Sequence, residues 1–222
     1  MLKGLSYDLL SRSFERGPGA RVRRRLLDGA RGEILEIGAG TGANLAHYPA
    51  AVTRLVLTEP DRGMAARLGR KLAQAQAPVE LVRAPAASLP FPDASFDVVV
   101  STLVLCTVPD PDDALAEIRR VLRADGSFLF LEHVRSSDPR RARWQDRLER
   151  PWGLLAGGCH PNRPSVERVR AAGFAVDTIE AGEMPGFPRI VRPYVAGAAS
   201  PNAPGTGVRA AERLRPIGRI PG

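Results

Sequence analysis

The sequence predicts an α/β fold with a mostly parallel sheet of seven strands and helices on both of its faces. Short runs rich in Val, Leu and Ile alternate with helical patterns over residues 31–134, and this order is typical of parallel strands joined by crossover helices. A glycine-rich turn directly follows the first apolar run, at residues 38–42, where such folds bind ligands. The length of 222 residues suits a single domain.

The expected strands are compact apolar runs, each ended by a loop or turn, as strands buried on both faces are. Five of them lie in the first part of the chain, at residues 33–38, 54–60, 79–84, 96–105 and 126–134. Two further runs, at residues 174–182 and 188–197, are expected to close the sheet.

Helical patterns separate these runs. They cover residues 61–76, 110–126, 138–151 and 163–173, and a further helix is expected to begin after the glycine-rich turn. The pattern at 110–126 begins with Asp and Pro and ends at Gly126, which are helix start and stop signals. The pattern at 138–151 is expected to stop around Pro151, because proline lacks the backbone donor that continues a helix.

Residues 1–198 are expected to form the domain, with an N-terminal helical cap segment at 1–30 and the core at 31–198. The tail at 199–222 is rich in Pro and Gly and has little apolar periodicity. We therefore expect this tail to be flexible.

The formal charge of +8 raises the question of a nucleic-acid partner. The arginines concentrate at residues 21–31 and 135–150, at helical spacing and without regularly interleaved aromatic residues to stack bases. Solvated helix faces explain them better, so no nucleic-acid partner is expected. The longest apolar run, 98–108, is too short to span a bilayer, and the N-terminus lacks an uninterrupted apolar stretch. We expect a soluble, cytoplasmic protein without an integral membrane anchor.

The two cysteines, Cys106 and Cys159, are far apart in the sequence and outside any paired-cysteine or zinc spacing. This argues against a disulfide scaffold and against a structural metal. Cys106 lies in an apolar run and is interpreted as a buried small hydrophobe. The role of Cys159, in a loop rich in Gly and Pro, stays open.

The glycine-rich turn contains Gly38, Gly40 and Gly42, one residue tighter than the G-x-G-x-x-G pattern of dinucleotide-binding proteins. Such a turn lets a ligand approach the main chain closely. Glu36, just before it, would repel a pyrophosphate but suit an ammonium group. Glu59, at the end of the second strand, is placed to accept hydrogen bonds from a ribose diol. A ligand with a ribose, an ammonium group and no phosphate is S-adenosylmethionine.

The chain resembles a class I S-adenosylmethionine-dependent methyltransferase from Tyr7 to about Ala198. The stretches that carry the resemblance are residues 36–44, 57–61 and 89–100. It implies a Rossmann-like class I methyltransferase fold, with S-adenosylmethionine as cofactor and S-adenosylhomocysteine as product. Two further stretches are similar to the subgroup called methyltransferase-like protein seven, whose members act as thiol S-methyltransferases; they are residues 101–134 and 148–174.

Ten residues are expected to bind the cofactor, from the turn itself and from the ends of neighbouring strands. They are Glu36, Gly38, Gly40, Gly42, Asn44, Glu59, Pro60, Met64, Ala86 and Thr102. Asn44 has the alternative of capping the following helix, and Met64 that of packing in the core. Related enzymes carry an acidic residue shortly before residues 89–91, which this chain lacks. The adenine is therefore expected to meet backbone groups near Ala86.

A small-molecule acceptor is expected, and the resemblance favours a thiol. The alternatives are O-, N- or C-methylation of a quinol, phenol, amine or lipid head group. A nicotinamide-dependent oxidoreductase and a non-catalytic cofactor-binding protein are less favoured, the first because of the glycine spacing and Glu36. The sequence says nothing about the oligomeric state.

The catalytic candidates are His133, Tyr7 and His160. His133 ends the fifth strand, where an imidazole can take a proton from a thiol more readily than the neighbouring Glu132 can. Its alternative role is that of a strand-end residue bonded to a neighbouring loop. The resemblance implies that Tyr7 closes over the cofactor, and His160 is the second histidine candidate.

Overall fold

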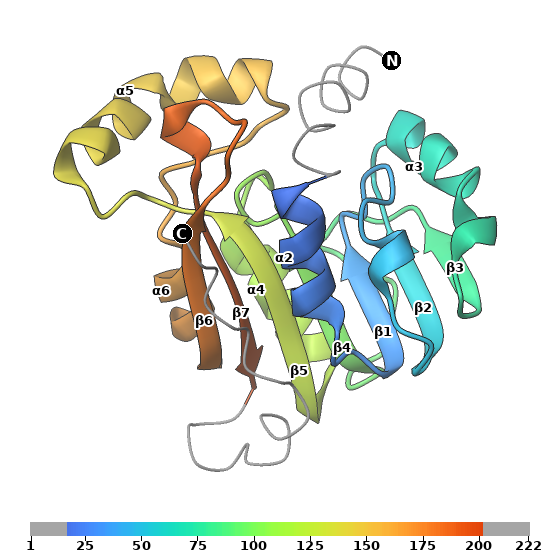
Figure 1. Ribbon diagram of the computed structural model, residues 1–222. Coiled ribbons are helices and arrows are strands. Elements are labelled where there is room, and N and C mark those ends of the chain that lie inside the picture. The colour runs from blue at the N-terminus through green and yellow to red at the C-terminus, as the bar shows by residue number, and fades with distance from the viewer. Residues whose placement is uncertain (1–16, 202–222) are drawn as a thin grey trace.

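The computed structural model describes residues 17–201, which form a seven-stranded sheet with the order β3-β2-β1-β4-β5-β7-β6 (Figure 1). The strands are β1 (Gly32–Ile37), β2 (Val52–Thr58), β3 (Val79–Val82), β4 (Phe96–Thr102), β5 (Leu122–His133), β6 (Ala175–Glu183) and β7 (Pro193–Ser200). Only β7 runs antiparallel to its neighbours, β5 and β6. The mostly parallel α/β fold that the sequence predicts is confirmed.

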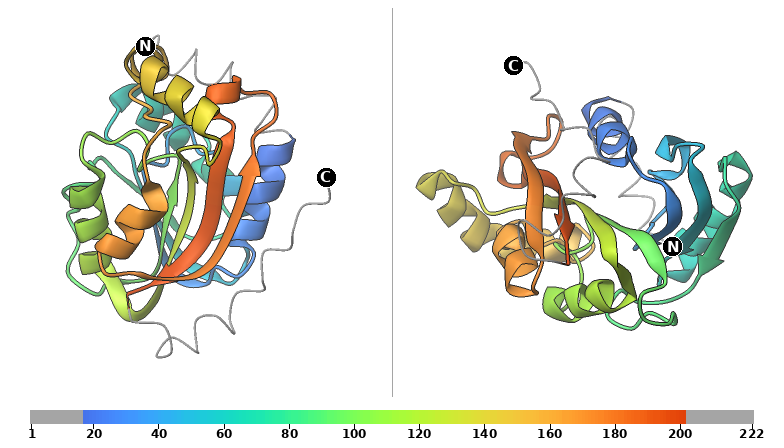
Figure 2. Two further views of the ribbon diagram at one scale, coloured as in Figure 1. Left: turned by 90° about the vertical axis from the view of Figure 1, so that its left-hand side faces the viewer. Right: turned by 90° about the horizontal axis from the view of Figure 1, so that it is seen from below.

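Helices cover both faces of this sheet. The α-helices are α2 (Pro18–Leu27), α3 (Arg62–Gly69), α4 (Pro111–Val121), α5 (Pro139–Leu155) and α6 (Ser165–Ala171). The 3-10 helices are η1 (Leu45–His47), η2 (Leu72–Gln74) and η3 (Arg189–Val191). The ribbon views show α2 on one face and α4 and α6 on the other (Figures 1 and 2). No helix in residues 17–201 combines the length and the apolar composition that a membrane span needs.

Alternating strand residues supply the two halves of the core. In β1, Ile34 packs on the α2 side together with Leu26, whereas Leu35 and Ile37 pack on the α4 side together with Leu115. Successive strand residues point to opposite faces, so a strand that is apolar at every position is buried on both. Each such side chain contributes about 1.5–3 kcal/mol to folding.

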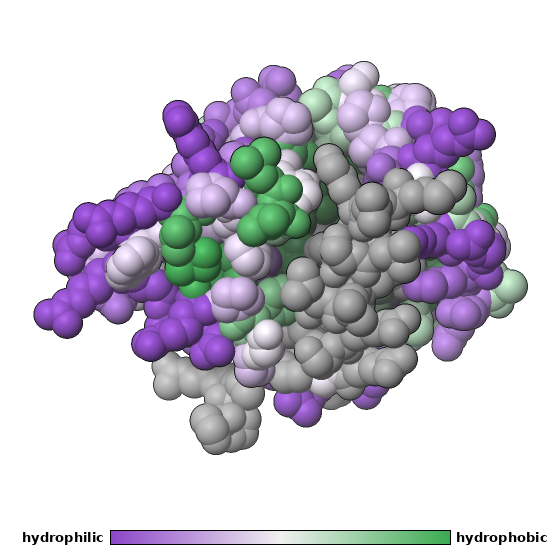
Figure 3. Space-filling model, turned by 90° about the horizontal axis from the view of Figure 1, so that it is seen from above, coloured by the Kyte–Doolittle hydropathy of each residue, from purple (hydrophilic) through white to green (hydrophobic). Residues whose placement is uncertain are grey.

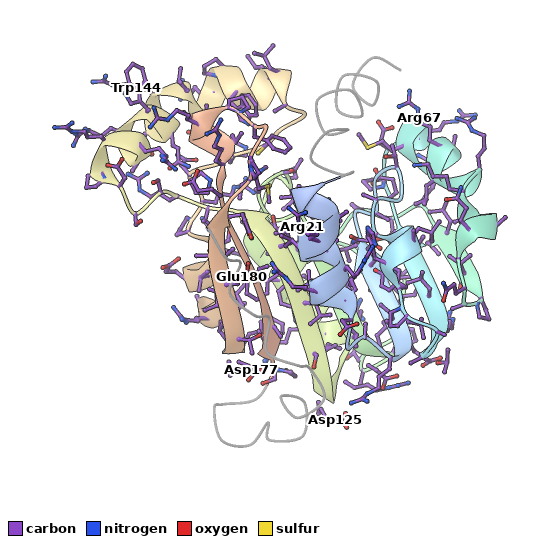
Figure 4. The ribbon with its side chains drawn as sticks, in the orientation of Figure 1. Arg21, Arg67, Asp125, Trp144, Asp177 and Glu180 are labelled. Carbon is purple, nitrogen blue, oxygen red and sulfur yellow. The ribbon has the colours of Figure 1, made fainter. Side chains whose placement is uncertain are left out.

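An ion pair fixes α2 to the far edge of the sheet. Arg25 of α2 donates a hydrogen bond to Glu180 of β6 at 3.0 Å, and Tyr194 of β7 donates to the same carboxylate at 3.2 Å. Figure 4 shows Glu180 between β6 and α2, while Trp144 lies on the outer surface of α5. Helix α2 is therefore tied to both closing strands.

Helix α4 ends at Val121, five residues before the expected stop at Gly126. The chain enters β5 at Leu122, which pairs with Phe96 of β4. Gly126 belongs to this strand, where a Cβ would lie 2.9 Å from the carbonyl oxygen of Asp97. The glycine marks a close approach of two backbones rather than a helix end, so this boundary was wrong.

Other boundaries differ from the expectation as well. Helix α3 ends at Gly69 rather than at residue 76, and the strand expected from residue 188 begins at Pro193, after η3. Helix α5 continues through Pro151 to Leu155. Pro151 removes only one backbone donor. The turn after it is still closed by the hydrogen bond from the Ala156 N–H to the Trp152 carbonyl. Strand β7 continues to Ser200, where it pairs with Ala175, two residues into the expected tail. Residues 202–222 of the tail lie outside the described residues.

Candidate active site

The glycine-rich turn leaves open space at one of its three glycines. Gly38, Gly40 and Gly42 all have positive φ, at 56°, 58° and 83°. A Cβ at Gly38 would lie 2.7 Å from Val104, and one at Gly42 would lie 2.7 Å from Leu68. At Gly40 the nearest atom would be the Gly38 carbonyl oxygen at 4.0 Å. Two glycines are therefore required by packing within the protein, whereas residues 17–201 leave the backbone of the third uncovered.

Glu59, which directly follows β2, fixes the backbone of this turn. One carboxylate oxygen accepts a hydrogen bond from the Gly40 N–H at 2.8 Å, and the other accepts one from the Asp61 N–H at 2.9 Å. Burial raises the pKa of Glu59, whose exposed fraction is 5%. Each oxygen keeps a further lone pair, so the carboxylate can still accept hydrogen bonds from a ligand.

Beneath the turn, Glu36 is the centre of a buried polar network. One of its carboxylate oxygens accepts from the Asn44 amide at 2.9 Å, and the other accepts from the Tyr48 hydroxyl at 2.6 Å. Arg23 of α2 donates to the Asn44 carbonyl oxygen at 2.9 Å and to the Thr102 hydroxyl at 2.8 Å. Burial raises the pKa of Glu36 to about 7. The network joins α2, β1, η1 and β4.

Asn44 therefore does not act as a helix cap. The helix expected after the glycine-rich turn is the single 3-10 turn η1, and Asn44 makes no side-chain bond to its backbone. His47, the last residue of η1, is partly exposed. The Asn44 side chain is instead fully buried between Glu36 and Arg23.

Sequence reasoning missed Arg23 and Tyr48. Arg23 lies among several arginines, but it occupies an apolar position of α2, on the stripe formed by Val22, Leu26 and Leu27, and its exposed fraction is 2%. A charged residue in an apolar helical stripe is the signal that would have identified it. Tyr48 follows a helix of only three residues. No local sequence pattern therefore indicates that its side chain reaches Glu36 of β1.

The remaining expected cofactor residues follow the ends of adjacent strands. Pro60 and Met64 come after β2, Ala86 follows β3 and Thr102 ends β4. Pro60 is exposed, Met64 is partly buried and Ala86 is buried. These strands are neighbours of β1 or β2 and run parallel to them, so the structure brings the predicted set to one edge of the sheet, the upper edge in Figure 1.

Leu103, directly after β4, has an unusual backbone conformation at the same edge of the sheet. It is a non-glycine residue with a φ of 61°, held by a hydrogen bond from its N–H to the Leu131 carbonyl at 2.7 Å. A bulky residue in this conformation costs on the order of 1–3 kcal/mol and persists mainly at functional sites. No feature of the sequence announces it.

Glu132 is fixed to the loop after β4. Its carboxylate accepts from the Ser101 hydroxyl at 2.8 Å and from the backbone N–H groups of Val104, Leu105 and Cys106 at 3.0–3.1 Å. The side chain is completely buried, and burial raises its pKa. Four donors occupy this carboxylate, which leaves it a poor candidate for proton transfer.

His133 lies against the two cysteines, which are far apart in the sequence. Its Nδ1 is 3.4 Å from the Cys159 Sγ and 3.8 Å from the Cys106 Sγ, and the two sulfurs are 3.9 Å apart. Both thiols are free and buried. The contact with Cys159 and burial raise the pKa of the Cys106 thiol, while the contact with Cys106 lowers the pKa of the Cys159 thiol. The His133 Nε2 is buried, and within residues 17–201 it meets no hydrogen-bond partner.

His160 adjoins this group from the loop after α5. Its backbone N–H donates to the Cys106 carbonyl at 2.6 Å, and its Nδ1 lies 2.7 Å from a Glu149 carboxylate oxygen. Figure 3 looks down on this end of the molecule and shows apolar residues among hydrophilic ones, and Leu154 and Leu155 at the end of α5 are exposed. Tyr7, the third catalytic candidate, lies outside the described residues.

Comparisons with known proteins show the family of this chain. Residues 35–130 match the family model described as "Methyltransferase domain". The chain is 35% identical over 170 residues to human thiol S-methyltransferase TMT1A, a match of 75% of this chain and 69% of that protein. It is 34% identical over 170 residues to a phosphatidylethanolamine N-methyltransferase of Cereibacter sphaeroides, which covers 75% of this chain and 78% of that one.

Solved structures show the same fold. A putative methyltransferase from Bacillus halodurans superposes with a TM-score of 0.66 at 14% identity, over 85% of this chain and 100% of that one. A geranyl diphosphate methyltransferase in complex with S-adenosylmethionine superposes with a TM-score of 0.64 at 15% identity, over 84% and 86% of the two chains. The chain therefore belongs to the S-adenosylmethionine-dependent methyltransferases, in the family that includes thiol S-methyltransferase TMT1A.

Proposed function

We propose that the protein methylates the sulfur of a small-molecule thiol. The observation that carries this proposal is the identity of 33–35% to thiol S-methyltransferases TMT1A and TMT1B over about three quarters of the chain.

The glycine-rich turn fits the cofactor. The free space at Gly40 accepts a ligand against the backbone, and Glu59 retains lone pairs for a ribose diol. The buried Glu36 carboxylate, held by Asn44 and Tyr48, would attract the ammonium group by its charge from beneath the turn, and we place the adenine against Met64 and the backbone near Ala86. We also assign Pro60 and Thr102 to the cofactor site. The bound cofactor supplies a methyl group on a sulfonium, which is already electrophilic.

The chain's own residues then position the acceptor and handle one proton. Alignment of a nucleophile opposite the leaving sulfur contributes on the order of 7 kcal/mol to lowering the barrier. A thiol with a pKa of about 8.5 needs only modest help to become a thiolate. Two imidazoles lie at the acceptor side, and the Nδ1 of His133 faces two thiols. His160, oriented by Glu149 through Nδ1, keeps Nε2 as a basic nitrogen and is the better base.

A methyl-transfer assay over matched thiols, phenols, amines and quinols tests the function. Methylation of thiols with identification of the S-methyl product by mass spectrometry supports the proposal. Turnover of the other acceptors without any thiol would refute it. His160→Ala is expected to slow methylation of a thiol of high pKa much more than methylation of an acidic thiol that is already ionised. His133→Ala, which leaves His160 in place, is expected to show no such difference between the two thiols. Equal slowing of both thiols by His160→Ala would remove the base role.

The second candidate function is N-methylation of a lipid head group. It is favoured by the 34% identity to a phosphatidylethanolamine N-methyltransferase, 78% of which is covered by the match. Vesicles that contain phosphatidylethanolamine, added to the same assay, separate the two functions. Head-group methylation without thiol methylation would place the protein with that enzyme.

A further inference from the structure

We propose that Cys106, His133 and Cys159 together bind a zinc ion. These three side chains are the group of potential ligand atoms that the described residues bring within 4.8 Å of one another. The sequence spacing argued against a metal, because Cys106 and Cys159 are 53 positions apart and His133 lies 27 positions after Cys106. The fold brings all three to the end of β5.

The distances match tetrahedral zinc. With bonds of about 2.3 Å to sulfur and about 2.05 Å to nitrogen, a tetrahedral ion holds two sulfurs about 3.8 Å apart and a sulfur and a nitrogen about 3.6 Å apart. The two sulfurs are 3.9 Å apart, and they lie 3.8 Å and 3.4 Å from the His133 Nδ1. Shifts of a few tenths of an ångström would therefore bring all three atoms into zinc-ligand positions. A disulfide would instead require the sulfurs to move to about 2.05 Å from each other.

The surrounding backbone holds the three donors in place without help from a metal. The Cys106 N–H is bound by the Glu132 carboxylate at 3.1 Å. The loop that carries Cys159 is attached to the loop after β4 through the bond from the His160 N–H to the Cys106 carbonyl at 2.6 Å. Arg163 reinforces this attachment by donating to the carbonyls of Leu105 and Val108 at 2.5 and 2.7 Å. Such preorganisation is what a metal site needs from its supporting residues.

The chemistry of the donors selects the ion. Two thiolates and one imidazole are soft to intermediate ligands, which favour zinc and disfavour magnesium and calcium. The charge of two thiolates is balanced by one divalent cation, which suits a site whose three residues are at most 6% exposed. Three protein ligands are the number found in zinc sites that keep one position for water or another ligand. In the metal-bound state Nδ1 of His133 is a ligand and Nε2 carries the proton, so His133 is not the base.

Metal uptake by the full-length reduced protein tests the proposal. The protein is stripped with a chelator, dialysed under reductant, and titrated with zinc and then with cobalt in separate samples. We expect one zinc ion per chain by elemental analysis, sulfur-to-cobalt charge-transfer bands with the visible bands of tetrahedral cobalt, and a higher melting temperature with zinc but not with magnesium. Substoichiometric zinc, or bound cobalt without charge-transfer bands, would overturn the proposal.

Variants locate the ion. Cys106→Ser, Cys159→Ser and His133→Asn are each expected to lower zinc affinity on the order of 100-fold or more, because each removes a ligand. His47→Gln removes an imidazole elsewhere and is expected to bind zinc like the parent protein. Uptake that persists in the Cys106→Ser/Cys159→Ser double variant would exclude the site.

A measurement on the unmutated chain keeps the test valid if these variants fold poorly. The chain has two cysteines, and both are proposed ligands. Zinc, but not magnesium, is therefore expected to slow the alkylation of both thiols in the native protein. Alkylation at the same rate with and without zinc, or oxidation of the pair to a disulfide in protein that takes up no zinc when reduced, would refute the site.

Discussion

Replacing Gly40 with Ala should separate cofactor binding from folding. The methyl group has room among residues 17–201, where its nearest neighbour would be 4.0 Å away, but it would occupy the space in which we place the cofactor. Forcing a side chain into a filled site costs about 1–3 kcal/mol. We therefore expect the dissociation constant of S-adenosylmethionine to rise about 5- to 150-fold, measured by isothermal titration calorimetry.

Gly157→Ala is the matched control. Gly157 also has a positive φ, 67°, and a Cβ there would meet no described residue within 4 Å. Both variants pay the same cost of about 1–2 kcal/mol for a left-handed residue with a side chain, so both should melt about 2–8 °C below the parent. Only Gly40→Ala should lose cofactor affinity. A Gly40→Ala protein that melts like the control and binds cofactor as the parent does would refute the position of the cofactor at the turn.

Three further perturbations probe the residues around the turn. Glu59→Ala should weaken cofactor binding by about 1–3 kcal/mol in calorimetry, because it removes both a ligand acceptor and the anchor of the turn; unchanged affinity would take Glu59 out of the site. Arg23→Met should lower the free energy of unfolding by about 3–5 kcal/mol in urea denaturation, since it leaves buried acceptors without a donor, whereas exposed Arg24→Met should change it by about 0.5 kcal/mol or less. The pKa of Glu36 in the folded protein, about 7, lies above the ordinary value of 4.5, so the folded state binds this proton more tightly than the unfolded state does. Protonation of Glu36 therefore adds on the order of 3 kcal/mol to the free energy of unfolding at low pH. This stabilisation is lost as pH rises from about 4.5 through 7. Wild type should therefore lose more stability than Glu36→Gln between pH 5 and pH 8 in cofactor-free protein, and equal losses would contradict the raised pKa.

The sequence predicted those parts of the protein that depend on local pattern. The strands could be identified because each is a short apolar run, and the turn at Gly38, Gly40 and Gly42 because three glycines follow such a run. The end of α4 was missed because Gly126 has the same sequence appearance as a helix stop, although the pairing of Leu122 with Phe96 already draws the backbone into β5. Tertiary contacts of this kind override local propensity.

The grouping of Cys106, His133 and Cys159 depends on contacts that no local sequence pattern records. Cys106, His133 and Cys159 come from a loop, a strand end and a second loop, and only the attachment of the two loops brings them together. The same holds for Leu103, whose positive φ is imposed by its bond to the Leu131 carbonyl. Rules based on cysteine spacing identify metal-binding residues that are close in the sequence. They cannot identify residues that are distant in the sequence and come together only in the folded chain.

With the cofactor at the turn, as we propose, the contact of Arg23 with Asn44 and Thr102 would make α2 part of the energetics of cofactor binding. Through Asn44, the guanidinium stabilises the same carboxylate, Glu36, that lies beneath the turn. Thermodynamic linkage then requires reciprocity: whatever the docking of α2 adds to cofactor affinity, the cofactor adds to the docking of α2. Amide hydrogens of residues 21–27 should accordingly exchange more slowly when the cofactor is bound, although none of these residues needs to touch it.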